Sequence, residues 1–382
     1  MNDNTILSYG DDMASYDADA YFRLPHASQM VWVKGHAVKL KSATELSGRQ
    51  GFVVAPFHAS DHKPLMLIEP VCVEVHPLKQ FSLPTAGELH DSSSYSQESF
   101  LDYSPTFQTY HEALLSGQFQ KLVLASKVYR LRHTDDIVFR AFQAACQLYP
   151  RMFISLFFTK ASGEWLTISP EPILQGDGHG NWSTSAVAGT MTLGADAPEG
   201  AEKLLTWSTK NRQEQCLVAH YVGQTLARLN IACKEQGPRS IRAGHLAHLC
   251  SDFSFQLDSA AINNKCTREG DVLAALHPTP AVCGLPKEDA EGFIQSHSMD
   301  SRSYYSGYAG PLNLPLPGDE QGQMMTRLYV SLRCMHATTM TLDLYAGGGL
   351  LPESDARQEW EERQEKLETM KRCLVAGRML TR

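Results

Sequence analysis

The sequence of 382 residues lacks three features that mark specialised classes of protein. It contains no run of about 18 apolar residues, which is the length that a membrane-spanning helix needs. It contains no block of Lys and Arg of the kind that binds nucleic-acid phosphates. Its nine cysteines are scattered singly, without a CxxC pair. These absences predict no membrane span, no nucleic-acid partner, and no structural zinc site or disulfide framework.

The composition itself is ordinary for a globular protein, with 43% hydrophobic and 20% charged residues. There are 34 Lys and Arg against 42 Asp and Glu, which gives a formal net charge of −8. Residues 1–25 are acidic and lack the basic region and apolar run of a secretory signal, so we expect a cytoplasmic chain with reduced cysteines. No internal repeat or linker is evident, and we therefore expect a single domain over residues 1–382.

The hydrophobic pattern predicts strands first and a mixture of strands and helices later. Residues 1–104 alternate short apolar runs with polar turns, which is typical of several strands. From residue 105 onward, the predicted helices span 105–116 with Ser104 as N-cap, 137–147, 209–230, 268–276, 287–295, and 355–376 after Ser354 as N-cap. The predicted strands there span 121–131, 152–158, 165–169, 244–257, 328–335 and 339–346. This order favours an α+β fold over a doubly wound parallel one.

Charged residues at helical spacing accompany two of the predicted helices. Glu359, Glu362 and Lys366 share one face of the last helix, beside an apolar stripe. They form either a solvated face or a pair of carboxylate ligands for Mg²⁺, which prefers oxygen donors. Glu214 lies near the start of the helix predicted at 209–230 and is either a surface residue or a third ligand. Periodicity does not show whether the two helices meet.

Three segments are unusual in backbone chemistry. Residues 276–287 combine three prolines and a glycine in a mostly apolar loop, which predicts a fixed wall rather than a tether. Residues 186–190 and 346–350 bring backbone without bulky side chains to a strand end. Each is either a place where a ligand carboxylate approaches peptide N–H groups, or a tight turn or bulge.

Taken in chain order, short motifs of this sequence resemble the chorismate-utilising enzymes, the family of anthranilate synthase component I, and within it the isochorismate synthases. The resemblance covers about residues 105–375. Its motifs are KLVLA at 121–125, SPE at 169–171, AGT at 188–190, Lys210 with Glu214, HLCS at 248–251, LHPTPAVCGLPK at 276–287, RSYYSG at 302–307, LR at 332–333, YAGGG at 345–349, and EWEE at 359–362 with Lys366. The LHPTPAV run is more similar to isochorismate and salicylate synthases than to anthranilate synthases. Ala188 stands where aminodeoxychorismate synthases often have a lysine that forms a covalent adduct.

The resemblance implies a large mixed or antiparallel sheet flanked by helices and an Mg²⁺-dependent isomerase that converts chorismate to isochorismate, for menaquinone or siderophore biosynthesis. It implies that Lys121 is the general base that activates water for attack at ring C2. It implies that Glu171 is the general acid that protonates the departing C4 hydroxyl. These roles require a lysine pKa that falls and a glutamate pKa that rises on burial. The plain alternatives are a surface lysine at a strand end and a loop carboxylate.

The remaining site residues are also implied by the resemblance. Glu214 and Glu362 would coordinate Mg²⁺, with Glu359 close by. The enolpyruvyl carboxylate would be received by Arg333, Tyr305 and the backbone of Gly347, Gly348 and Gly349. The substrate pocket would also be lined by Gly189, Thr190, His248 and Lys366. His248 is equally well interpreted as a satisfied core histidine.

The sequence departs from the family pattern at four positions. Asn211 stands where many relatives have an acidic residue, and Ser126 stands where an arginine is common, although Lys127 follows it. Ser298 and Ser301 replace a frequent Glu and Asp. None of these departures removes a proposed acid, base or direct metal ligand. Two further readings stay open, a salicylate synthase that also eliminates pyruvate and a catalytically inactive relative that acts as a binding protein. In every case we expect a monomer without a glutamine amidotransferase subunit.

Overall fold

The structure is a computed structural model that describes residues 5–8, 16–82, 89, 93, 95–97, 99–132, 134, 136–193, 197–257, 267–297, 302–315 and 324–380. Its helices are α1 (Phe100–Leu115), α2 (Ile137–Leu148), α3 (Thr209–Arg228), α4 (Glu269–Leu276), α5 (Lys287–His297) and α6 (Ala356–Met379). Short 3₁₀ helices span Ala43–Leu46 and Ala201–Leu204. Five of the six helices begin within one residue of their predicted start, and the exception is α1.

The strands are β1 (Thr5–Ser8), β2 (Ala18–Arg23), β3 (Gln29–Leu40), β4 (Gly51–Ala55), β5 (Leu65–Pro77), β6 (Lys121–Leu131), β7 (Phe153–Thr159), β8 (Gly163–Ser169), β9 (Pro172–Gly176), β10 (Asn181–Thr192), β11 (Cys233–Ala243), β12 (Leu246–Gln256), β13 (Gly284–Leu285), β14 (Tyr308–Leu312), β15 (Leu314–Pro315), β16 (Met324–Val330), β17 (Cys334–Ala337) and β18 (Thr341–Leu350). Following the strand pairs gives the order β13–β6–β18–β17–β8–β7–β2–β3–β5–β4–β14–β16–β9–β10–β12–β11. β1 also pairs with β5, and β15 pairs with β16. Every described pair is antiparallel, which confirms the α+β prediction and settles the sheet as antiparallel.

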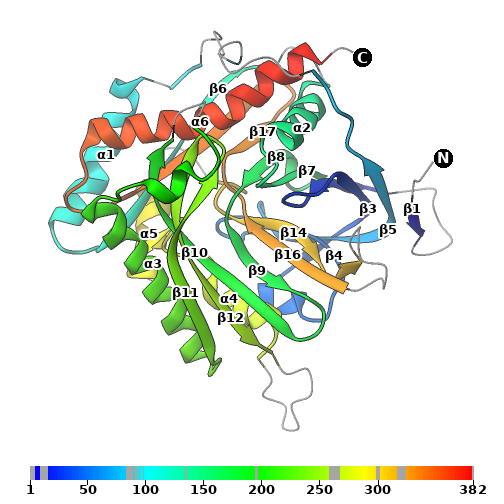
Figure 1. The fold of residues 1–382 in the computed structure, drawn as a ribbon, viewed down its shortest axis with the longest axis horizontal. Helices are drawn as coiled ribbons and strands as arrows, with labels where there is room; N and C mark the ends of the chain where they lie inside the picture. The colour runs from blue at the N-terminus through cyan, green and yellow to red at the C-terminus, as the bar shows by residue number, and fades with distance from the viewer. Residues whose placement is uncertain are drawn as a thin grey trace.

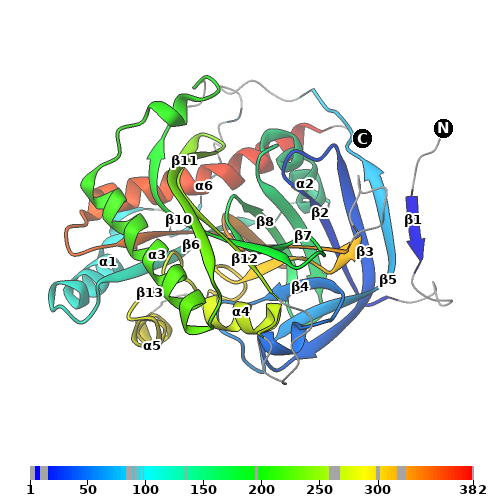
Figure 2. The ribbon, with the colours of Figure 1, turned by 60° about the horizontal axis from the view of Figure 1, so that its bottom comes forward.

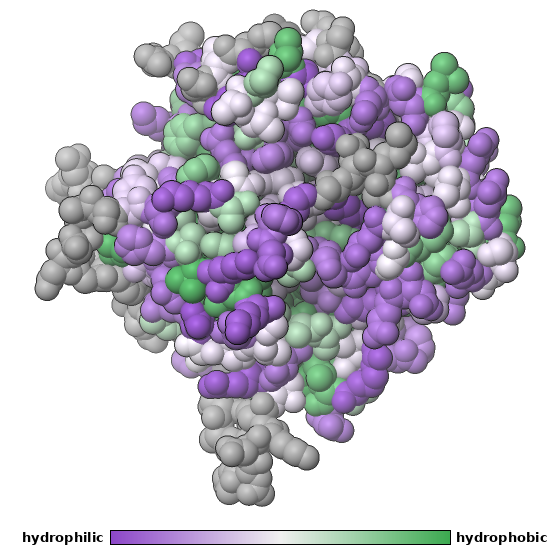
Figure 3. Space-filling view, turned by 180° about the vertical axis from the view of Figure 1, so that it is seen from behind, coloured by the Kyte–Doolittle hydropathy of each residue, from purple (hydrophilic) through white to green (hydrophobic). Residues whose placement is uncertain are grey.

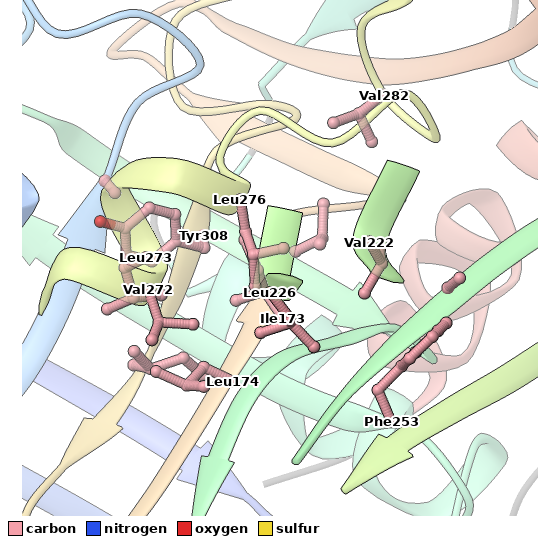
Figure 4. Packing of buried hydrophobic residues seen from close by; sticks show 14 of the residues in the cluster. Ile173, Leu174, Val222, Leu226, Phe253, Val272, Leu273, Leu276, Val282 and Tyr308 are labelled. Atoms are coloured by element: carbon pink, nitrogen blue, oxygen red, sulfur yellow. The ribbon is translucent and has the colours of Figure 1, made fainter. Parts of the chain in front are cut away.

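Helices cover two parts of this sheet (Figures 1 and 2). Under α2 and α6, a buried cluster joins Phe142 and Leu367 to side chains of β6, β7, β8 and β18. Under α3 and α4, a second cluster packs Val222 and Leu273 against β9 and β12 (Figure 4). A third cluster joins the N-terminal strands to later ones, with Phe22 among its members. The N-terminal strands therefore share a core with strands from the later region that carries the motifs, at about residues 105–375.

The start of α1 differs from the prediction. The helix begins at Phe100 rather than residue 105, and Pro105 lies inside it. Ser99 is the N-cap because its hydroxyl accepts a hydrogen bond from the Asp102 amide, while Asp102 accepts one from the Ser99 amide. This reciprocal capping box competes successfully with the Ser-Pro signal at 104–105. At α6 the N-cap is likewise Asp355 and not Ser354, since Asp355 accepts from two backbone amides.

Three strand predictions are also wrong in detail. The strand predicted at 328–335 is divided into β16 and β17, because Arg333 adopts a left-handed backbone with φ of 45°. β11 was not predicted, since most of its side chains are exposed and it lacks an apolar alternation. The strands β9, β10, β13, β14 and β15 were not predicted either. β18 extends to Leu350, so the glycine triplet lies inside a ladder in which Gly347 faces Ala125 of β6. The triplet is therefore neither a turn nor a strand end.

Three further features concern the helices, the surface and the cysteines. No helix among the described residues is long and apolar enough to cross a membrane. The face seen in Figure 3 is mostly hydrophilic, with apolar residues in small groups. The eight described cysteines are free thiols.

Candidate active site

A cavity of about 70 Å³ gathers most of the predicted site residues. Its lining includes Glu171, Gly189, Thr190, Glu214, His248, Tyr305, Arg333, Gly347, Gly349 and Lys366. These residues come from α3, α6, β10, β12, β18 and the loops before β9, β14 and β17. Four predicted residues, Lys121, Gly348, Glu359 and Glu362, lie outside the lining. The fold thus brings segments that are far apart in the sequence together around one cavity.

The apolar walls of the cavity were not assigned as site residues from the sequence, although all of them except Val187 lie in the quoted motifs. They are Val123, Pro170, Val187, Ala188, Ala281, Val282, Leu332 and Ala346. The signal that could have found two of them is the proline-rich segment 276–287, whose prediction as a fixed wall is confirmed. The Val123 amide donates to the Cys283 carbonyl at 2.7 Å. Arg302 donates to the carbonyls of Val282 and Val123, and so fastens the wall to β6.

Glu171 lies in the connection between β8 and β9 and is only 3% exposed. The Ser169 hydroxyl accepts a hydrogen bond from the Glu171 amide at 3.2 Å, and the Glu171 carbonyl accepts one from Val330. Burial raises the pKa of Glu171 to about 8, although the positive charges of Lys121 and Arg333 oppose the rise. Glu171 is therefore protonated at neutral pH and can donate a proton into the cavity.

Lys121 is the first residue of β6, and its side chain is fully buried rather than on the surface. Its Nζ lies 2.9 Å from Oε1 of Glu214 on α3. Gly349 makes room for this pair. A Cβ atom at position 349 would lie 2.1 Å from Glu214 Oε1 and 2.8 Å from Lys121 Cε. Glycine is therefore required here for space, not for a special backbone angle.

Arg333 occupies the left-handed break between β16 and β17 and is buried. Its Nη2 donates to His248 Nε2 at 2.6 Å, while His248 Nδ1 donates to the Gly189 carbonyl at 3.0 Å. Burial and the neighbouring positive charges lower the pKa of His248 well below its usual value, so the ring is neutral. His248 is thus both a satisfied histidine and a lining residue, and the two readings of it from the sequence hold together.

Two further donors of Arg333 remain for a ligand. Its Nε and Nη1 are buried and have no hydrogen-bond partner among the described residues. The free N–H groups of a buried guanidinium suit an anionic ligand such as a carboxylate. Tyr305 lies nearby, and burial raises its pKa to about 12, so its hydroxyl stays protonated as a donor. A Cβ at position 347 would lie 2.9 Å from that hydroxyl, so a side chain there would crowd it.

Glu359 and Glu362 of α6 do not form a solvated face. Glu359 is 3% exposed and forms an ion pair with Lys210 near the start of α3. Glu362 pairs with Lys366 at 2.7 Å, and Lys366 also donates to the Gly347 carbonyl at 2.9 Å. Burial raises the pKa of Glu359, and the Glu362 carboxylate raises it further. The two helices therefore meet at charged residues, which periodicity could not show.

The carboxylates fit Mg²⁺ in chemistry, although they are not gathered into a cage. Glu359 Oε2 is buried and has no hydrogen-bond partner in the described part of the chain. The space above Gly348 is bordered by carboxylate oxygens, because a Cβ there would lie 3.4 Å from Glu359 Oε2 and 3.8 Å from Glu362 Oε1. Such hard oxygen donors are what Mg²⁺ prefers. Within the described ranges, no group of three or more His, Cys, Asp or Glu is placed to hold a metal ion.

The departures from the family pattern have structural explanations where they are described. Asn211 is buried and its Nδ2 donates to the Thr190 carbonyl at 3.3 Å, so it supports β10. Lys127 pairs with Asp343 at 3.2 Å instead of lining the cavity, so it does not supply the charge expected beside Ser126. Ser298 and Ser301 lie outside the described residues.

Comparison with known proteins shows the family to which the chain belongs. A family model described as chorismate binding enzyme matches residues 56–375. The chain belongs to the chorismate-binding enzyme family. The motif resemblance is thereby confirmed at the level of the family.

Individual relatives of this chorismate-binding enzyme are distant. It is 28% identical over 303 residues to the isochorismate synthase MenF of Escherichia coli K12, covering 76% of this chain and 62% of that protein. It is 28% identical over 312 residues to the salicylate biosynthesis isochorismate synthase of Pseudomonas aeruginosa, covering 77% and 58%. The aligned region thus spans about three fifths of these relatives. The solved structure of the menaquinone-specific isochorismate synthase MenF from Escherichia coli superposes with a TM-score of 0.73 at 19% identity, over 97% of this chain and 94% of that one, which shows a shared fold.

Proposed function

We propose that this protein is an Mg²⁺-dependent isochorismate synthase, an isomerase that exchanges the hydroxyl position on the ring of chorismate. The observation that carries the proposal is the protonated Glu171 in the same cavity as the two free donors of Arg333. A proton donor beside an anion-binding guanidinium suits a carboxylated substrate that loses a hydroxyl group. The names of the relatives, both isochorismate synthases, support the same assignment.

Two buried side chains divide the proton transfers. In this proposal the Lys121 ammonium, which pairs with Glu214 in the structure, first loses a proton to solvent. The resulting amine takes a proton from a water molecule while the water oxygen forms a bond to ring C2. Glu171 gives its proton to the C4 hydroxyl as the C4–O bond breaks, and the ring double bonds shift between the two carbons. One water is consumed and one released, so atoms and charge balance. The burial of both side chains supports these roles, because a dry site strengthens proton transfer between positioned groups.

Binding roles follow from the remaining contacts. We assign the enolpyruvyl carboxylate to Arg333, Tyr305 and the backbone around Gly347–Gly349. Glu214 and Glu362, with Glu359 close by, would hold Mg²⁺, which when bound supplies Lewis-acid and orienting charge for the ring carboxylate. Gly189, Thr190, His248 and Lys366 complete the lining.

The cellular setting is also part of the proposal. We propose a cytoplasmic, single-domain monomer that works without a glutamine amidotransferase subunit. Free cysteines and the core shared by N-terminal and later strands support the compartment and the single domain. The product would feed menaquinone or siderophore biosynthesis.

Product analysis tests the function. Purified protein is incubated with chorismate, with and without Mg²⁺, and the products are separated by chromatography. We expect Mg²⁺-dependent isochorismate without salicylate. Salicylate and pyruvate in the absence of a partner enzyme would instead identify a salicylate synthase. Absence of any Mg²⁺-dependent turnover would favour an inactive relative that binds without reacting.

A further inference from the structure

Each carboxylate proposed to hold Mg²⁺ already has a lysine partner in the protein. The pairs are Lys121–Glu214, Lys210–Glu359 and Lys366–Glu362. Three negative and three positive charges give this cluster a formal charge of zero. A divalent cation that joins the cluster therefore brings two uncompensated positive charges, unless a lysine leaves or an anion arrives with the metal.

Lys210 differs from the other two lysines in ways that make it the movable one. Its side chain is 24% exposed, against 0% for Lys121 and 15% for Lys366. Lys366 is tied by a second bond to the Gly347 carbonyl, whereas Lys210 has one ion-pair partner among the described residues. Burial alone would lower the pKa of Lys210, but the carboxylates of Glu359, Glu214 and Glu362 together raise it. Its ammonium thus lies within the field of all three proposed ligands.

We propose that Lys210 takes the place of the metal cation among these carboxylates in the metal-free protein, and that Mg²⁺ binds by displacing its ammonium from Glu359. The inference rests on the metal site of the proposed function and goes beyond it by assigning a competitor. Lys210 contacts Oε1 of Glu359. The second oxygen, Oε2, is buried and has no hydrogen bond in the described residues, so it can act as a ligand for the incoming ion. The exposure of Lys210 gives the displaced ammonium a path to water, where its solvation is restored.

The competition predicts that removing the Lys210 charge tightens metal binding. The test is calorimetric titration of the substrate-free protein with Mg²⁺ alone. Lys210→Gln keeps a hydrogen-bond donor for Glu359 but removes the charge, and we expect it to bind Mg²⁺ about tenfold more tightly than the wild type. Lys210→Arg keeps the charge and should bind like the wild type. Lys39→Gln is the matched control, because Lys39 forms an exposed pair with Asp61 far from the cluster in sequence, and it should change nothing.

Thermal unfolding gives a second readout that does not depend on catalysis. Without metal, Lys210→Gln leaves the buried Glu359 carboxylate without its counter-charge and should melt at a lower temperature than the wild type. Added Mg²⁺ should raise the melting temperature of this variant more than that of the wild type, because only the variant lacks a competing cation.

The outcomes separate the inference from the function on which it rests. Equal or weaker Mg²⁺ binding by Lys210→Gln, with measurable binding by the wild type, would overturn the competition while leaving the metal site in place. Equal tightening by Lys210→Arg would show that charge is not the cause, and would overturn it too. Absence of Mg²⁺ binding in every protein, with or without chorismate, would refute the metal site itself.

Discussion

Glu171 and the three glutamates at the junction of α3 and α6 are the same residue type, but only the three glutamates form ion pairs with lysines in the described part of the chain. Glu171 is buried without an ion pair among the described residues, and its pKa rises to about 8. Glu214, Glu359 and Glu362 each meet a lysine ammonium. Positive partners lower the pKa of Glu362 in spite of its burial.

This difference divides the chemistry of the site. We propose that Glu171, a carboxyl group that stays neutral on burial, serves as the proton donor, and that the three carboxylates paired with lysines serve as metal ligands. The division arises from placement in the fold, since all four residues are glutamates. Mutations that change one side of the comparison should therefore leave the other largely intact.

The largest effect is expected at Lys121, the proposed base, which also forms an ion pair with Glu214. Lys121→Ala should abolish isochorismate formation, because no other described amine lies at this position to accept the proton from water. Chorismate binding, measured by calorimetry, should remain detectable because Arg333 is untouched. Full activity of this variant would refute the assignment of the base.

Glu171→Gln removes the proton donor while keeping the shape of the side chain. Turnover should fall by roughly 10²–10⁴, the usual contribution of a general acid. The dissociation constant of chorismate should change little, since the substitution replaces a neutral group with a neutral group. A turnover number equal to the wild type would place the acid elsewhere.

Glu362→Gln changes one of the three glutamates that are paired with lysines. The variant should need a higher Mg²⁺ concentration for half-maximal activity, because one charged ligand becomes a neutral one. At saturating Mg²⁺ we expect much of the turnover to return. An unchanged metal titration would show that the metal site lies elsewhere.

The glycines of β18 offer a matched pair of small changes. Gly349→Ala should lower the free energy of unfolding by about 1–3 kcal/mol and reduce activity, since its Cβ would overlap Glu214 and separate it from Lys121. Gly348→Ala meets no heavy atom closer than 3.4 Å and should fold nearly as well as the wild type. Chemical denaturation measures both. Equal losses in the two variants would mean that strand propensity, and not this close approach, decides the cost.

The pH dependence of stability should have opposite signs for Glu171 and Glu362. The folded pKa of Glu171 lies above its unfolded value of about 4.5, so the folded state binds more protons between about pH 4.5 and 8. Its contribution to stability is complete below that window and is lost as pH rises through about 8. The lowered pKa of Glu362 contributes above its unfolded pKa and is lost on acidification.

Comparing the wild type with Glu171→Gln isolates the first of these terms. Between pH 6 and pH 8 the wild type should lose free energy of unfolding relative to the variant, by at most ~1.4 kcal/mol per pH unit. A constant difference across this range would show that Glu171 does not titrate there. Wild-type turnover should also decline above about pH 8, as the acid loses its proton.

Local signals in the sequence predicted much of the framework. β6 has the predicted bounds, and α2 and α3 differ from prediction by two residues or fewer, because their apolar periodicity and terminal residues agree. The family motifs predicted the convergence of Glu171, Arg333 and Glu214 on one cavity. Where two capping signals competed, as before α1, the pattern alone favoured the wrong serine.

Long-range contacts were beyond the sequence. Lys210 and Glu359 are 149 residues apart, and nothing in either helix indicates that they pair. The left-handed backbone at Arg333 has no local signature, since the position carries neither Gly nor Asn. The sequence left the glycine triplet as either a place of ligand approach or a tight turn or bulge, because the crowding around Gly349 comes from β6 and α3, which no window of local sequence contains.

The most direct test of the catalytic account is the fate of oxygen in the ring. Wild-type protein is incubated with chorismate and Mg²⁺ in water enriched in ¹⁸O, and the isochorismate is analysed by mass spectrometry after short times. Attack by a water that Lys121 activates predicts one ¹⁸O atom in the product, at C2, with the original C4 oxygen released to solvent. Isochorismate that retains the original hydroxyl oxygen would contradict the account, because it would mean that the hydroxyl migrates without a water nucleophile.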